Sequence, residues 1–153
     1  MWDRLLLPAL VVVCGCGTEP VQGEPAWFPA DYRETYLEAR TCRLSLEHSA
    51  YIRVLTPPDV SDAYARTQPF ADGALLLKEQ YAQGDVTCSR PIKAFTVMRK
   101  LPMGSSPTTL DWEWQEVGTD LRERAVEIEN CVGCHDTCGK APMGYDGTCS
   151  EPL

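Results

Sequence analysis

Two cysteines and a histidine near the C-terminus are the residues of this chain best suited to chemistry. Cys131 and Cys134 are separated by two residues, and His135 follows directly, so the stretch reads C-x-x-C-H. This spacing is used to attach a c-type haem, because each thiol can form a thioether with one vinyl group of the porphyrin. The adjacent imidazole then becomes an axial ligand of the iron. The motif predicts one covalent haem c, bound by Cys131 and Cys134 and ligated by His135.

Two other uses of these cysteines remain open from the spacing alone. Four thiolates could form a structural zinc site. The same four residues could instead be paired as disulfides. The residues concerned are Cys131, Cys134, Cys138 and Cys149.

The first sixteen residues predict an export signal. Residues 5–13 form an apolar run of nine, which matches the hydrophobic region of a signal peptide and is too short to cross a bilayer. Cys16 follows a glycine, as in the bacterial lipobox, and we expect it to receive the lipid; an ordinary secretory signal cut nearby is the alternative. We therefore expect a chain exported to the periplasmic face of a bacterial membrane, held there by a lipid anchor only.

Export favours disulfides over free thiolates. Two of the eight cysteines lie in the signal and two hold the haem, so four remain, and four cysteines allow three pairings. Pairing Cys138 with Cys149, and Cys42 with Cys88, is favoured because the first pair closes a short local loop.

The composition bounds the rest of the molecule. We assign residues 1–16 to the signal, 17–27 to a tether and 28–153 to a single haem-binding domain, because about 137 residues suffice for one core but hardly for two. The net charge of −8 excludes a general nucleic-acid binder and would suit a basic redox partner protein.

Hydrophobic periodicity predicts an antiparallel sheet with a few short helices, an α+β fold. In residues 73–81, Ala74, Leu76 and Lys78 face one way, and the intervening residues face the other. His48 lies in a polar stretch and is expected to be exposed. The predicted helices cover residues 32–41, 59–66 (capped by Asp59) and 121–130, and the predicted strands cover 50–55, 73–81, 93–100 and 110–117.

Four segments, in this order and followed by the C-x-x-C-H motif, resemble the cytochrome P-460 family, which includes the β-sheet cytochromes c′. The resemblance covers residues 28–135, and the cysteine-rich end after it is no part of it. The segments are residues 28–34, 51–54, 70–79 and 111–114.

This resemblance implies a five-coordinate c-type haem packed against the sheet, usually in a homodimer. His135 would be the proximal ligand, and the other face of the iron would bind a small diatomic or hydroxylamine-like ligand. In members with the matching strand motif, the residue equivalent to Lys78 can be bonded to the porphyrin rim, and such members oxidise hydroxylamine. Burial against the haem would lower the pKa of Lys78, as that bond requires. A solvated lysine at a strand end is the alternative.

Residues 93–100 are the strand expected to line the open face of the iron. Phe95, Val97 and Arg99 share one side of it, and the segment holds no Asp or Glu that could accept a proton. Phe95 there would restrict the site to small ligands, and Arg99 could stabilise a bound anion. Core packing and a surface charge are the simpler roles for these two residues, so the sequence leaves open whether the protein is a haem-dependent oxidoreductase.

The sequence thus predicts an exported monohaem c-type cytochrome that binds or redox-processes a small nitrogen species such as nitric oxide or hydroxylamine. One alternative is a hydroxylamine-oxidising enzyme with a haem cross-linked to Lys78. The other is a haem-free structural lipoprotein stapled by disulfides.

Overall fold

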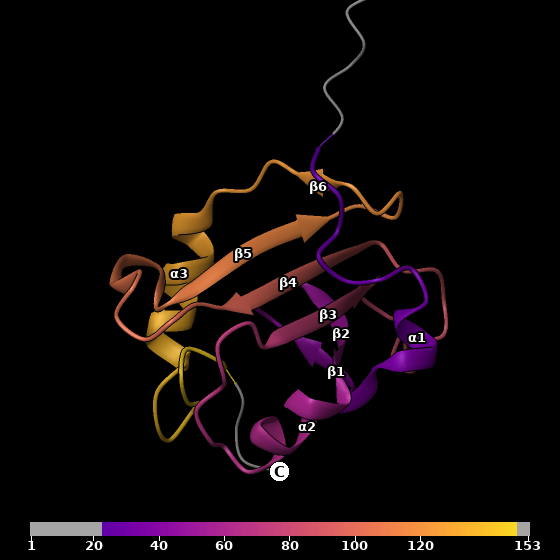
Figure 1. Ribbon diagram of the computed structural model, residues 1–153. Helices are drawn as coiled ribbons and strands as arrows, with labels where there is room; N and C mark the ends of the chain where they lie inside the picture. Colours follow the sequence, from indigo (N-terminus) through magenta and orange to yellow (C-terminus); the bar gives the residue numbers. More distant parts are fainter. Residues whose placement is uncertain (1–22, 150–153) are drawn as a thin grey trace, which may run out of the picture.

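The computed structural model describes residues 23–149, which form a six-stranded antiparallel sheet. The strands lie in the sheet in the order in which they occur in the chain (Figure 1). They are β1 (Leu37–Ser45), β2 (Ala50–Thr56), β3 (Leu75–Tyr81), β4 (Ala94–Lys100), β5 (Trp112–Val117) and β6 (Glu123–Arg124). The helices are α1 (Tyr32–Thr35), α2 (Pro58–Ala65) and α3 (Ile128–Cys138), with a 3₁₀ turn η1 (Pro107–Thr109). The predicted α+β class and antiparallel sheet are confirmed.

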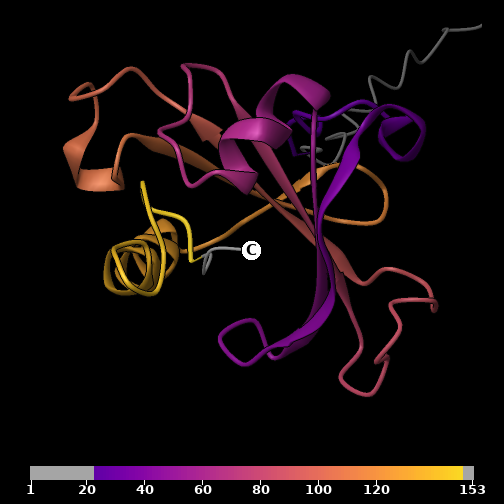
Figure 2. The same cartoon turned by 90° about the horizontal axis from the view of Figure 1, so that it is seen from below.

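The sheet has an apolar cluster on each face, because side chains alternate along each strand. One cluster contains Leu76, Met98 and Trp114, and α2 and α3 pack against it; we call this side the α3 face. The other cluster contains Leu77 and Phe95 together with Tyr32 of α1; we call this side the α1 face. In Figure 2, α3 and the β1–β2 turn lie on one side of the sheet and α1 lies on the other.

Two helix predictions were wrong. The helix predicted at residues 32–41 is only one turn long, because residues 37–45 form β1, which pairs with β2 with two shifts of register. The helix predicted at 121–130 is replaced by β6, which pairs with β5, and by α3, which begins at Ile128 and contains the whole C-x-x-C-H motif.

The remaining predicted elements are present with shifted ends. The strands predicted at 50–55, 73–81, 93–100 and 110–117 correspond to β2, β3, β4 and β5. The helix predicted at 59–66 is α2, but its N-cap is Pro57 rather than Asp59. Pro58 occupies the first helical turn, where its fixed φ suits the helix and its missing N–H removes no hydrogen bond.

Within the expected tether, residues 24–27 form hydrogen bonds with the sheet. The Glu24 carbonyl accepts a hydrogen bond from the Glu123 amide, and the Trp27 amide donates to the Gln115 side chain at 3.1 Å. The predicted signal peptide and Cys16 lie outside the described residues. In the described part of the chain, no helix is long and apolar enough to cross a membrane.

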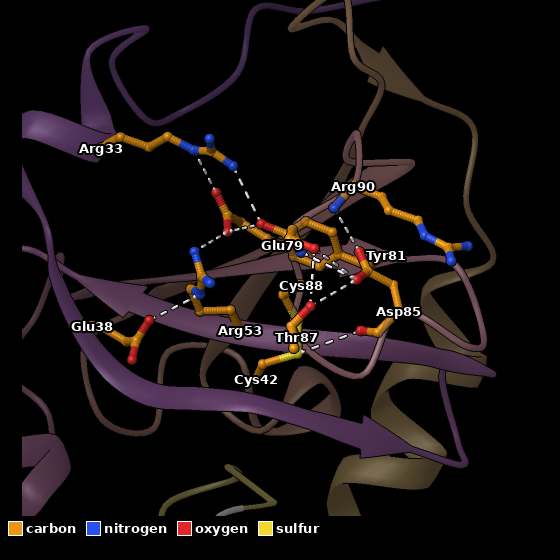
Figure 3. The surroundings of a disulfide bond; sticks show 11 residues. Arg33, Glu38, Cys42, Arg53, Glu79, Tyr81, Asp85, Thr87, Cys88 and Arg90 are labelled. Atoms are coloured by element: carbon orange, nitrogen blue, oxygen red, sulfur yellow. Dashed lines mark hydrogen bonds and ion pairs between the residues drawn. A yellow bond between two sulfur atoms is a disulfide. The ribbon is translucent and has the colours of Figure 1, made fainter.

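Two disulfides join the cysteine pairs that the sequence favoured. Cys42 of β1 is bonded to Cys88 of the β3–β4 loop, with 5.6 Å between their Cα atoms (Figure 3). Cys138, at the end of α3, is bonded to Cys149, with 4.8 Å between their Cα atoms. The first bond ties the edge strand to the sheet, and the second closes the C-terminal loop onto α3.

A buried carboxylate organises the α1 face. Glu79 is inaccessible to solvent and accepts hydrogen bonds from the hydroxyls of Tyr32 at 2.6 Å and Tyr81 at 2.5 Å. Arg33 lies 3.0 Å and Arg53 3.7 Å from its oxygens (Figure 3). Burial, and next the carboxylate of Glu79, raise the pKa of Tyr32 to about 12, so this tyrosine remains a donor.

Candidate functional site

Helix α3 carries both cysteines of the motif on consecutive turns. Cys131 and Cys134 are the two described cysteines outside disulfides. Cys131 is half-buried against the apolar cluster of the α3 face, whereas Cys134 is exposed. Burial raises the pKa of the Cys131 thiol. The zinc alternative loses two of its four ligands to the Cys138–Cys149 bond, and no group of three metal-ligating side chains occurs within residues 23–149.

His135 is buried and held in one orientation from two sides. Its ring packs against the Trp114 ring in a T-shaped arrangement, with 4.7 Å between ring centroids. Its Nδ1 lies 2.6 Å from the carbonyl oxygen of Gly147. A carbonyl can only accept, so Nδ1 carries the hydrogen, and Nε2 of the neutral ring keeps a free lone pair. Burial, and next the positive charge of Lys78, lower the pKa of His135 to about 4, which keeps the ring neutral.

Lys78 lies on the same face of the sheet as α3. It pairs with Val54 of β2 on one side and with Thr96 of β4 on the other, and Val54 belongs to the cluster of the α3 face. Burial, and next the charge of Arg43, lower the pKa of Lys78 to about 8. The predicted direction of its side chain is confirmed, and its amine loses a proton far more readily than an ordinary lysine.

His48 is the partner of this lysine, although the sequence predicted it to be exposed. It comes from the β1–β2 turn, is half-buried, and its Nε2 lies 2.8 Å from Nζ of Lys78. Burial, and next the charges of Lys78 and His135, lower the pKa of His48 to about 3. The ring is therefore neutral, and its Nε2 can accept a hydrogen bond from the ammonium group.

The comparison with known families gives one match. A family model described as Cytochrome P-460 matches residues 29–143. The chain belongs to the cytochrome P-460 family. A comparison with curated proteins found no match. The membership supports a haem-binding cytochrome, as the order of the sequence motifs predicted.

The residues present fit a c-type haem. The two free thiols are spaced for the two vinyl groups, and His135 has an oriented Nε2 free for iron. On the same face, the hydroxyl of Thr96 is buried and has no hydrogen-bond partner among the described residues. Such a hydroxyl is available to a partner other than this polypeptide.

In this member of the cytochrome P-460 family, the side of β4 that the sequence assigned to the open face of the iron lies on the α1 face of the sheet instead. Phe95 and Val97 belong to the cluster of the α1 face, with Tyr32. Arg99 forms an ion pair with Glu113 at 2.6 Å and lies over Trp27, with 4.3 Å from its guanidinium carbon to the ring centroid. These residues lie across the sheet from His135, so the roles expected for Phe95 and Arg99 at the iron are not supported.

The α3 face contains a carboxylate that the sequence reasoning overlooked. Glu116 of β5 pairs with Thr96, which in turn pairs with Lys78, so the three residues form one row across the sheet. The charge of Glu116 also acts on Cys131. The alternation of β5 could have predicted its position, because Glu116 follows Trp112 and Trp114 at a two-residue spacing and therefore shares their face.

Proposed function

We propose that this member of the cytochrome P-460 family is an exported monohaem c-type cytochrome that binds or redox-processes a small nitrogen species. Cys131 and Cys134 would hold the haem through thioethers, and Nε2 of His135 would ligate the iron. The observation that carries the proposal is the state of His135: Nδ1 is committed to the Gly147 carbonyl, and the ring stands beside two free thiols on the same helix. A bound haem supplies an iron that can exchange electrons and coordinate a small ligand.

The polar residues of the α3 face support a small polar ligand. Lys78 is a cationic donor and His48 a neutral acceptor at hydrogen-bond distance, and Thr96 adds an unused hydroxyl. Nitric oxide and hydroxylamine are small enough for such a site and can form hydrogen bonds. Phe95 and Val97 do not limit the size of a ligand on the α3 face, because they belong to the apolar cluster of the α1 face.

The lowered pKa of Lys78 favours a second candidate function, that of a hydroxylamine-oxidising enzyme. An amine with a pKa of about 8 is partly neutral near physiological pH, as attachment to the porphyrin rim requires. The charge of Lys78 also acts on both Cys131 and His135, which supports a role for this lysine beside the groups that would hold the haem. Glu116, in the same row of the sheet as Thr96 and Lys78, is then a carboxylate on this face that could accept a proton.

Haem staining of a denaturing gel tests the main proposal, because only thioether-linked haem survives denaturation. The chain is produced with a haem-attachment system, and the pair Cys131→Ala and Cys134→Ala is compared with the pair Cys138→Ala and Cys149→Ala. We expect the stain to be lost in the first pair and retained in the second. A wild-type protein that is colourless despite a competent attachment system would leave the haem-free, disulfide-stapled lipoprotein.

Absorption and intact mass then separate the two haem functions. A red-shifted Soret band that returns to the ordinary position in Lys78→Arg supports the cross-link. An unshifted band in the wild type rejects it and leaves a ligand-binding or electron-transferring cytochrome. Export is tested separately, by fractionating cells and measuring the mass of the N-terminal peptide, which carries lipid if Cys16 is the modified residue.

A further inference from the structure

The C-terminal loop that contacts His135 is fastened to the sheet by a buried ion pair. Lys100, at the end of β4, lies 2.8 Å from Asp146, and the lysine side chain is 8% exposed. The other carboxylate oxygen of Asp146 accepts a hydrogen bond from the Phe70 amide at 3.1 Å. Buried ion pairs are costly unless every partner is satisfied, and here both carboxylate oxygens are used.

A second anchor acts on the backbone of the same residue. The indole Nε1 of Trp112, a fully buried residue of β5, donates to the Asp146 carbonyl at 2.8 Å. Lys100 also lies over the Trp112 ring, with 4.9 Å from Nζ to the centroid. One residue of the loop is thereby held through its side chain and its carbonyl by two neighbouring strands.

Gly147, the residue after Asp146, makes the contact with His135. Gly147 has a φ of +75°, and a Cβ there would lie 3.1 Å from Nε1 of Trp112. Only glycine therefore combines this conformation with this close approach. Its amide donates to the Gly139 carbonyl, and its own carbonyl accepts from Nδ1 of His135. The disulfide Cys138–Cys149 closes the same loop onto α3.

We propose that Lys100 and Asp146 are positioning residues for His135, acting through the Gly147 carbonyl. The inference rests on the proposed function, because it concerns the histidine as an iron ligand. A hydrogen bond from Nδ1 fixes the ring orientation and makes the imidazole a stronger donor, so it tunes the metal from outside its ligand set. Lys100 of β4, and Asp146 in the loop closed by the Cys138–Cys149 disulfide, thus help to set the properties of the iron.

The test compares Lys100→Met with Lys140→Met in the haem-loaded protein. Both changes remove one positive charge that pairs with an aspartate, but Lys140 pairs with Asp136 on the exposed surface of α3 and holds no loop. The measurements are the iron–histidine stretching frequency by resonance Raman and the reduction potential of the haem. For Lys100→Met we expect the stretch to move to lower frequency and the potential to rise, because the histidine becomes a weaker donor. Lys140→Met should leave the frequency unchanged.

Further variants keep the proposal falsifiable if Lys100→Met does not fold. Trp112→Phe keeps an aromatic ring in the core but removes the indole donor to Asp146, and it should lower the same frequency. Asp146→Glu, which retains the carboxylate, should lie closer to the wild type than Asp146→Ala. Equal frequencies in the wild type, Lys100→Met and Trp112→Phe would overturn the positioning role. A wild-type protein without covalent haem would instead overturn the proposed function, so the two failures are distinguishable.

Discussion

Lys78 and Glu79 are adjacent in β3, yet their charged groups serve opposite faces of the sheet. Lys78 contacts His48 on the α3 face, whereas Glu79 contacts Tyr32 on the α1 face. The two-residue period of a strand produces this separation. The sheet therefore keeps a polar site and a structural ion cluster apart by no more than its own thickness.

Replacing Glu79 with Ala should strongly destabilise the fold. The carboxylate is fully buried and bonded to two tyrosines, with two arginines beside it, so its loss leaves buried donors unpaired. We expect the free energy of unfolding to fall by about 3–5 kcal/mol in urea denaturation. Glu113→Ala is the matched control, because Glu113 forms an ion pair with Arg99 in which each side chain is 40% exposed. That change should cost at most about 1 kcal/mol, and equal losses in the two variants would contradict the assignment.

His48 should make stability depend on pH below neutrality. Its pKa is about 3 in the folded protein and near the ordinary 6.5 when unfolded, so the unfolded chain binds more protons between these values. Its contribution is complete above pH 6.5 and is lost as the pH falls, at up to about 1.4 kcal/mol per pH unit. Aspartate and glutamate side chains also titrate as the pH falls, but they are the same in the wild type and in His48→Gln, so their effect cancels in the comparison. The loss of unfolding free energy between pH 7 and pH 5 should therefore be smaller in His48→Gln, and identical losses would show that His48 is exposed.

The strands could be predicted from the sequence where one residue in two is apolar. β3 was found: its first three residues are buried apolar residues, and its last four alternate between partly exposed (Lys78, Gln80) and buried (Glu79, Tyr81) positions. β1 was not found, because it is an edge strand whose side chains are mostly exposed and show no such alternation. Its helix-like spacing of apolar residues was overruled by pairing with β2, which is a tertiary effect.

The candidate site was predictable only as far as its motif. The spacing of Cys131, Cys134 and His135 indicated the candidate site, but that all three lie within one helix was not predicted. The facing residues were harder, because both sides of β4 are apolar: Phe95 and Val97 on one, Met98 on the other. Which side of β4 packs against α3 depends on the path of the chain between β5 and α3. The alternation of residues within β4 does not predict that path. His48 was missed because a polar turn ordinarily indicates exposure.

The two disulfides should differ in what their removal changes. The chain-entropy model assigns about 4 kcal/mol to a cross-link spanning 46 residues and about 3 kcal/mol to one spanning 11. Replacing Cys42 and Cys88 together with Ala should therefore lower the free energy of unfolding and leave the haem spectrum unchanged, because this bond joins β1 to the β3–β4 loop and not to α3. Replacing Cys138 and Cys149 should alter the spectrum as well, since it loosens the loop that holds Gly147. An altered spectrum in the first pair alone would contradict this division.

Replacing Gly133 and Gly144 with alanine should change the free energy of unfolding in opposite directions. A Cβ on Gly133, between the two motif cysteines, would meet nothing within 4 Å, whereas one on Gly144 would overlap the carbonyl oxygens of Thr148 and Cys138. Because glycine in the interior of a helix costs about 1 kcal/mol relative to alanine, Gly133→Ala should raise the free energy of unfolding by about 0.5–1 kcal/mol. Gly144→Ala should lower it and disturb the C-terminal loop. Thermal unfolding measures both effects, and haem staining checks that Gly133→Ala still carries the covalent group. A loss of stain in Gly133→Ala would show that this position is in contact with something the open space around it does not reveal, and would place the haem against that turn of α3.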